Sequence, residues 1–379
     1  MDLGKTAQTL LSVLCAELRR DDSPVITIDS AEELLALAGR HDVECIAADH
    51  IFKRGLTKTD PALKKASLKA RGAAQFCCMN QQRLLEETSR LFEEKGIDHI
   101  PLKGAVLRDL YPEPWMRTCS DIDVLVHEGD MDRATAVLEQ DLHMKKVFSG
   151  SHDVKFNYKG AVALELHFRL IEHGRIREAS RILSDVWLYT YGSGRCKRMK
   201  NEMLYLYHIV HMAKHFENGG CGMRSLMDLW LMNHRLSFDE AEKQRLLADA
   251  ELSRFADRME AVSEKWFSEE LIGENDPVER YILEGGSFGS FGRNVAVKKE
   301  KNGGSIGYIR SRIFVPYDYL RLQYPAIEDK RYLTPVYEVV RWFRFLSPES
   351  RAHSLSELKS LAKDDHDDDI AVLREVGLI

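Results

Sequence analysis

One short segment, residues 120–126, constrains the fold more than any other part of the chain, because it reads Ser-Asp-Ile-Asp-Val-Leu-Val. Successive side chains of a strand point to opposite faces, so Asp121 and Asp123 would share one face here. Ile122 and Val124 would lie on the other face. The segment therefore predicts a strand with one acidic and one apolar face. Two carboxylates at a strand end are also the oxygen ligands that a hard divalent cation such as Mg²⁺ prefers.

Composition limits the remaining possibilities. The chain has 379 residues, enough for roughly two or three domains, and a formal net charge of −6. This charge argues against a broad basic surface for nucleic acid or acidic membranes. The seven cysteines are scattered without a C-x-x-C spacing, which is typical of reduced thiols. No uncharged apolar run approaches the length of a membrane-spanning helix. We therefore expect a cytoplasmic protein whose partners include neither a membrane nor a nucleic acid.

The N-terminal segment, residues 1–95, is predicted to be helical. Leucines recur at helical spacing near its start, which favours a structural helix over the signal-peptide core that residues 7–16 otherwise resemble. Ser30 and Glu33 form a capping box for the next helix. A longer helix is expected over residues 61–95, with Cys77-Cys78-Met79 filling core space.

The middle segment, residues 96–195, alternates strand and helix signals. The expected elements are strand 97–102, helix 105–110, strand 121–126, helix 131–140 capped by Asp130, and strands 152–158 and 161–168 joined by a Lys159-Gly160 turn. Residues 196–379 are again predicted to be mainly helical, over 204–216, 225–234 and 238–262 among others. We therefore expect an α+β protein with a small mixed-sheet core between N- and C-terminal helical segments.

A third carboxylate is predicted to join the acidic pair. Glu165 lies between Leu164 and Leu166 in a strand signal, and His167 would share its face. A carboxylate flanked by leucines is costly to bury unless it is paired or bound to a metal. The alternative is an edge strand on which Glu165 faces solvent.

An anion site is predicted upstream of the acidic pair. Lys103-Gly104 stands between a strand signal and a helix start, where free backbone N–H groups favour anions. Gly104 would let a phosphate approach the backbone closely, and Lys103 would supply a mobile positive charge.

Together these pieces resemble the DNA polymerase beta-like nucleotidyltransferase superfamily. More narrowly, they are similar to the uncharacterised bacterial nucleotidyltransferase-like family. The resemblance rests on Leu-Lys-Gly-Ala at 102–105, Tyr-Pro-Glu-Pro at 111–114, Arg-Thr-Cys-Ser-Asp-Ile-Asp at 117–123 and Glu-Leu-His at 165–167. It implies that the middle segment is a nucleotidyltransferase-like core.

The resemblance also implies an activity. This would be Mg²⁺-dependent transfer of a nucleoside monophosphate from a nucleoside triphosphate, such as ATP, to a hydroxyl of a small molecule or protein, with release of pyrophosphate. Asp121, Asp123 and Glu165 would bind two Mg²⁺ ions as the catalytic carboxylates, and Glu165 would help to deprotonate the attacking hydroxyl. Phosphoryl transfer needs mainly positioning and charge neutralisation, so three carboxylates with metal can suffice.

Nucleotide binding is assigned to a second set of residues, with phosphate neutralisation as the main role of its basic members. The set is Lys103, Gly104, Arg117, Ser120 and His167, with Arg169 as a further candidate. The superfamily usually has Gly-Ser at the turn where this chain has Lys-Gly-Ala. This departure favours an alternative in which the fold is catalytically retired and acts as a nucleotide- or protein-binding module.

Several other features allow more than one interpretation. His208, His211 and His215 would share a helix face, which suits a structural role, a substrate-contacting surface or the zinc site of a hydrolase. Arg224 and Asp228 are predicted to form an intrahelical ion pair. The glycine-rich stretch 285–292 suits a hydrophobic flap or an open surface loop. The acidic run 364–369 is expected to be a solvated surface.

Overall fold

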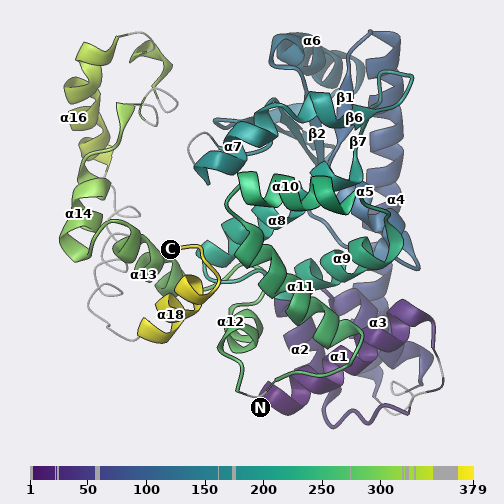
Figure 1. Cartoon of the computed structure of the whole chain (residues 1–379). Coiled ribbons are helices and arrows are strands. Elements are labelled where there is room, and N and C mark those ends of the chain that lie inside the picture. Colours follow the sequence, from purple (N-terminus) through teal and green to yellow (C-terminus); the bar gives the residue numbers. More distant parts are fainter. Residues whose placement is uncertain are drawn as a thin grey trace.

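A computed structural model describes residues 3–21, 23, 25–55, 60–160, 162–172, 176–273, 275–317, 320, 324–327, 330–344 and 366–379. The N-terminal segment contains helices α1 (Leu3–Arg19), α2 (Ala31–Arg40), α3 (Glu44–Lys53) and α4 (Pro61–Glu94). The predicted cap of α2 is confirmed, because the Ser30 side chain accepts a hydrogen bond from the Glu33 N–H. Helix α4 is about 50 Å long and connects the N-terminal helices with the sheet (Figure 1).

The middle segment forms a five-stranded mixed sheet in the order β1-β2-β5-β4-β3. Its strands are β1 (His99–Pro101), β2 (Asp121–Val126), β3 (Lys145–Ser149), β4 (Asp153–Tyr158) and β5 (Val162–His167). Strands β2 and β5 pair in parallel, and the other neighbours pair antiparallel. The short helices α5 (Gly104–Leu107), α6 (Met131–Ala136) and α7 (Arg177–Ser184) also lie in this segment. Strands β6 (Thr190–Tyr191) and β7 (Arg198–Met199) form a separate hairpin across its end at residue 195.

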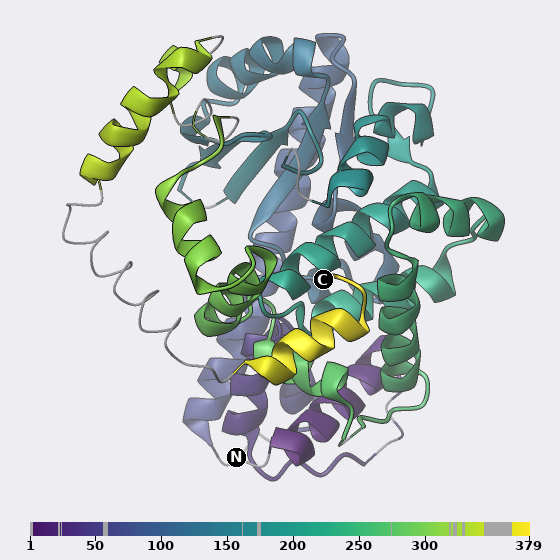
Figure 2. The same cartoon turned by 60° about the vertical axis from the view of Figure 1, so that its left-hand side comes forward.

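The two faces of the sheet differ, as the alternation in β2 predicts. Ile122, Val124, Leu164 and Leu166 are buried in an apolar core that includes residues of α4 and α6. The opposite face carries the carboxylates. Figure 2 shows α4 running behind the sheet. The predicted strand with one acidic and one apolar face is therefore confirmed.

The C-terminal segment is mainly helical. Its helices are α8 (Asn201–Glu217), α9 (Gly222–Arg235), α10 (Glu240–Asp249), α11 (Ser253–Phe267), α12 (Pro277–Gly285), α13 (Phe291–Lys301), α14 (Ser305–Ile313), α16 (Thr334–Arg344) and α18 (Asp367–Glu375). Buried side chains of α1, α2, α3, α8, α9, α11, α12 and α18 form one continuous apolar core. The first and last parts of the chain thus share a core, whereas α14 and α16 stand apart from it in Figure 1.

Several sequence predictions need correction. The expected helix 238–262 is divided into α10 and α11 at Glu251, whose φ of 58° cannot continue a helix. Asp130 does occupy the position before α6, but its side chain pairs with Arg133 instead of capping the backbone. Met79 is 69% exposed and fills no core. Strand β3 and the β6–β7 hairpin were not predicted.

The glycine-rich stretch 285–292 is an ordered turn between α12 and α13. The Ser287 N–H donates to the Arg40 carbonyl (2.9 Å), and a Cβ on Gly286 would lie 2.6 Å from that same oxygen. Phe288 is 76% exposed, so it covers no site here. Asp364 and Asp365 lie outside the described residues. Within the described part of the chain, no helix combines the length and apolar character that crossing a membrane requires.

Candidate functional site

Sheet register brings the predicted carboxylates together. Asp123 on β2 is the parallel partner of Glu165 on β5, so their side chains leave the sheet side by side on the polar face. Asp121 lies on the same face at the start of β2. The register between β2 and β5 therefore places all three predicted catalytic carboxylates on one face of the sheet.

His167 completes a compact group with two of these carboxylates. Its Nε2 lies 2.8 Å from Asp123 Oδ1 and 3.7 Å from Glu165 Oε2. One potential ligand atom from each of Asp123, Glu165 and His167 lies within 4.8 Å of the others. Asp121 is outside this group. Among the described residues, it is this group that has the size of a metal site.

Lys103 reaches the same carboxylates from the start of α5. Its Nζ lies 2.9 Å from Asp123 Oδ1. Its backbone φ of 42° falls in a region that side-chain-bearing residues rarely adopt, at a cost of about 1–3 kcal/mol. Burial alone would lower the pKa of the Lys103 ammonium, but Tyr207 and Asp123 outweigh burial and hold this pKa above its usual value. Lys103 is therefore a fixed cation at the site.

Lys155 on β4 provides a second cation that the sequence analysis missed. Its Nζ lies 2.8 Å from Glu165 Oε1 and 3.8 Å from Asp121 Oδ2. The hydrogen bond to Glu165 raises the pKa of the Lys155 ammonium. A signal was present, because Asp153, Lys155 and Asn157 alternate with apolar residues of β4 and so belong to the polar face.

The two aspartates of β2 have opposite electrostatic surroundings. Burial and the nearby carboxylates of Asp123 and Glu165 raise the pKa of Asp121. Burial alone would also raise the pKa of Asp123, but Lys103 and His167 outweigh it and hold this pKa well below its usual range. Asp123 is thus ionised at neutral pH, whereas Asp121 holds its charge at a cost.

The structure places Arg117 in a buried ion pair. Its guanidinium donates to both oxygens of Asp228 on α9, with Nη2 2.8 Å from Oδ2, and the Tyr111 hydroxyl donates to the same carboxylate. The predicted intrahelical pair of Arg224 and Asp228 is therefore wrong. Arg224 instead pairs with Asp42 (3.2 Å). In this structure the Arg117 charge is neutralised by Asp228.

The other predicted nucleotide-binding residues lie in different surroundings. Gly104 is buried, and a Cβ there would meet Arg117 Nη1 at 2.7 Å, so its small size serves this packing. Ser120 is exposed just before β2. Arg169 is exposed and pairs with Glu128 at 3.2 Å. Of the predicted nucleotide-binding set, Lys103 and His167 contact the predicted catalytic carboxylates directly.

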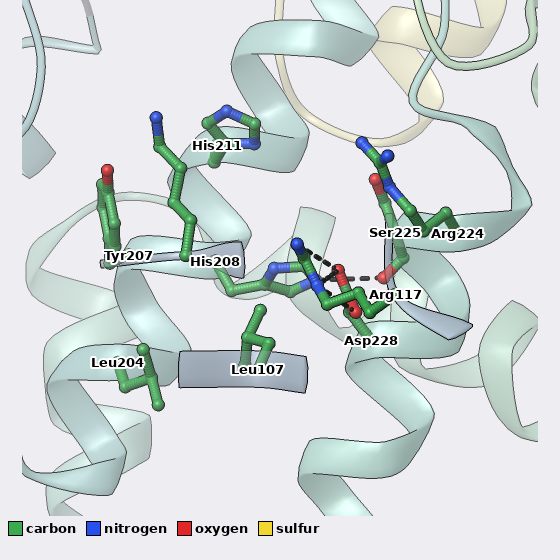
Figure 3. Close-up of a pocket in the computed structure, with 10 residues that line it drawn as sticks. Leu107, Arg117, Leu204, Tyr207, His208, His211, Arg224, Ser225 and Asp228 are labelled. Atoms are coloured by element: carbon green, nitrogen blue, oxygen red, sulfur yellow. Dashed lines mark hydrogen bonds and ion pairs between the residues drawn. The ribbon is translucent and has the colours of Figure 1, made fainter. Parts of the chain in front are cut away.

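Two of the three histidines of α8, His208 and His211, line a narrow cavity beside Lys103. His208 Nε2 lies 3.0 Å from the Ser225 carbonyl, and His211 Nε2 lies 3.3 Å from His215 Nε2. In the described part of the chain no third ligand joins His211 and His215, so a zinc centre is not formed there. The cavity, of about 30 Å³, has room for a water molecule (Figure 3).

Residues 29–268 match the model of a protein family described as uncharacterised nucleotidyltransferase. The match covers more than half of the chain and includes the sheet and every site residue above, so the chain belongs to this family. No curated protein and no solved structure matches the chain.

Proposed function

We propose that the chain transfers a nucleoside monophosphate from a nucleoside triphosphate, such as ATP, to a hydroxyl of a small molecule or protein and releases pyrophosphate. The observation that carries this proposal is the gathering of Asp123, Glu165 and His167 beside Asp121 on one face of the sheet. Family membership supports nucleotidyl transfer in general. The placement in the polymerase beta-like superfamily, the use of Mg²⁺ and the cytoplasmic location are parts of the same proposal.

The donor set fits one divalent cation. Ligand atoms within 4.8 Å of one another can surround a single ion, and carboxylate oxygens suit Mg²⁺ or Mn²⁺. His167 could use Nε2 as a ligand only if its ring proton moved to Nδ1, a buried atom without a hydrogen-bond partner among the described residues. We therefore assign the ligands to Asp123 and Glu165 of this group, add Asp121 from the same face although it lies outside the 4.8 Å spacing, and give His167 the task of orienting Asp123.

Each side chain has a task that follows from its surroundings. A bound divalent ion would neutralise phosphate charge and position the triphosphate for in-line attack. Asp123 remains ionised and serves as a ligand rather than as a base, because its pKa is well below the usual range. Glu165 is the candidate to accept the proton of the acceptor hydroxyl. Lys103 is the nearest fixed cation for a phosphate oxygen.

The proposal is tested by incubating the pure protein with Mg²⁺ or Mn²⁺ and each labelled nucleoside triphosphate, with cell metabolites or with the protein alone. We expect label transfer and pyrophosphate release that both disappear in the Asp121→Ala/Asp123→Ala double variant. Pyrophosphate release that survives in the double variant would show that these carboxylates do not carry the reaction.

A second candidate function is a retired fold that binds nucleotide or a partner protein without catalysis. The observation in its favour is that Lys103 and Lys155 already neutralise two of the three negative charges. Gly104 is also packed against Arg117 rather than open to a phosphate. Tight binding of nucleotide, measured by calorimetry, with no pyrophosphate release under any of the above conditions would favour this function.

A further inference from the structure

The pairing of the strands places Lys155 beside the carboxylates of the site. Lys155 on β4 is the antiparallel partner of Glu165, which is in turn the parallel partner of Asp123. The three residues therefore form one row across adjacent strands, and their side chains leave the same face of the sheet. The ammonium position follows from the pairing of the strands.

The Lys155 ammonium lies where two carboxylates can share a cation. Its Nζ is 2.8 Å from Glu165 Oε1 and 3.8 Å from Asp121 Oδ2. The other two cationic or hydrogen-donating groups, Lys103 and His167, both contact Asp123 Oδ1 instead. Asp121 is thus the carboxylate left outside the three-residue group, and Lys155 is the cation that reaches it.

Charge counting shows why this matters. Three ionised carboxylates carry three negative charges, and two protonated lysines leave one. In two-metal phosphoryl-transfer sites the two ions lie about 4 Å apart, and carboxylates that both ions share hold them there. A second ion would have to share Asp121 or Glu165 with the Lys155 ammonium, which already pairs with both carboxylates. Two cations that share a carboxylate lie close enough to repel each other strongly.

We propose that Lys155 occupies the position of one of the two metal ions, so that the site takes one divalent ion and uses a lysine as its second cation. The inference rests on the proposed function, because it concerns the same carboxylates. Lys155, which lies outside the sequence motifs, would then set the number of metal ions. The ammonium would neutralise charge at the site but, unlike a metal ion, could not coordinate a phosphate oxygen.

The test counts bound Mn²⁺ per chain by the loss of the free-ion electron paramagnetic resonance signal, with affinity from calorimetry. The variant Lys155→Met removes the charge at similar side-chain length, and Lys155→Arg keeps it. Lys146→Met is the matched control, since Lys146 is an exposed strand lysine that pairs with Phe156 and so belongs to the opposite face. Thermal unfolding of each variant shows that it is folded.

We expect one Mn²⁺ more per chain in Lys155→Met than in the wild type, bound at least about tenfold more tightly than any second ion of the wild type. Lys155→Arg and Lys146→Met should match the wild type. An unchanged count and affinity in a folded Lys155→Met chain would overturn the inference. The number bound by the wild type tests the proposed function separately, because one ion is expected there and a wild type that binds none would contradict the metal-dependent function whatever Lys155→Met does.

Discussion

The two faces of the five-stranded sheet use the same strands for opposite purposes. On the apolar face, Ile122, Leu164 and Leu166 are buried with exposures of 0–1% among residues of α4 and α6. On the polar face, the carboxylates of Asp121 and Glu165 are half-buried and that of Asp123 is buried, so like charges lie close together there. Strand alternation alone separates the two sets, so side chains that stabilise the fold and side chains that carry the site are next to one another in sequence. The difference predicts that substitutions one residue apart have unlike effects.

The largest expected effect is on the polar face. Asp123→Asn should reduce nucleotidyl transfer on the order of 10³-fold or more, because it removes the carboxylate that contacts both Lys103 and His167 and is assigned as a metal ligand. Initial rates of pyrophosphate release and Mn²⁺ affinity measure the effect. A variant that keeps its rate within about tenfold of wild type would remove Asp123 from the catalytic set.

On the apolar face we expect a loss of stability without a loss of metal binding. Leu164→Ala should lower the free energy of unfolding by about 2–5 kcal/mol, because Leu164 is fully buried and its truncation leaves a cavity. Urea unfolding measures this change, and Mn²⁺ titration of the folded variant should match the wild type. Glu165→Gln, one residue away, should instead weaken Mn²⁺ binding without a comparable loss in the free energy of unfolding. Loss of metal binding in folded Leu164→Ala would contradict the separation of the two faces.

Much of this arrangement could be predicted from sequence, because alternation is a local signal. The polar and apolar sides of β2 and β5, the long helix α4 and its end before Gly96 all follow from spacing and capping. Strand β3 was missed because all five of its residues are exposed and it lacks alternation. The parallel pairing of β2 with β5 depends on a crossover that no local pattern specifies.

The candidate site was harder to predict where long-range pairing decides. Arg117 and Asp228 are 111 residues apart, and their ion pair could not be inferred from the i, i+4 spacing that suggested Arg224 as the partner. Lys155 was overlooked because a lysine on a strand usually faces solvent. Its role becomes visible only when β4 is placed beside Glu165.

A smaller effect of opposite sign should distinguish the two aspartates of β2. Because the pKa of Asp121 is raised, its ionised form destabilises the fold, and Asp121→Asn should raise the free energy of unfolding by about 0.2–1 kcal/mol at neutral pH. The gain should vanish as the pH falls through this raised pKa, because the wild-type carboxyl is then protonated.

Asp123, with its lowered pKa, stabilises the fold when ionised. Asp123→Asn should therefore destabilise at neutral pH, and this loss should shrink as the pH falls below the ordinary value of 3.8. Thermal unfolding across pH 3–8 measures both; equal signs for the two variants would contradict their different surroundings.

The smallest effect is expected at Ser120, which lies exposed just before β2. Ser120 is exposed, so Ser120→Ala should change the free energy of unfolding by less than about 0.5 kcal/mol. If its hydroxyl binds the nucleotide as the resemblance implies, KM for the triphosphate should rise by about threefold to tenfold while kcat stays the same.

Thr118→Ala is the matched control from the same loop, because the Thr118 hydroxyl donates to the Asp42 carbonyl (3.1 Å). That control should lose about 1 kcal/mol of stability and keep its KM. Steady-state kinetics with both variants decide the role, since an unchanged KM in Ser120→Ala would leave this hydroxyl outside the nucleotide site.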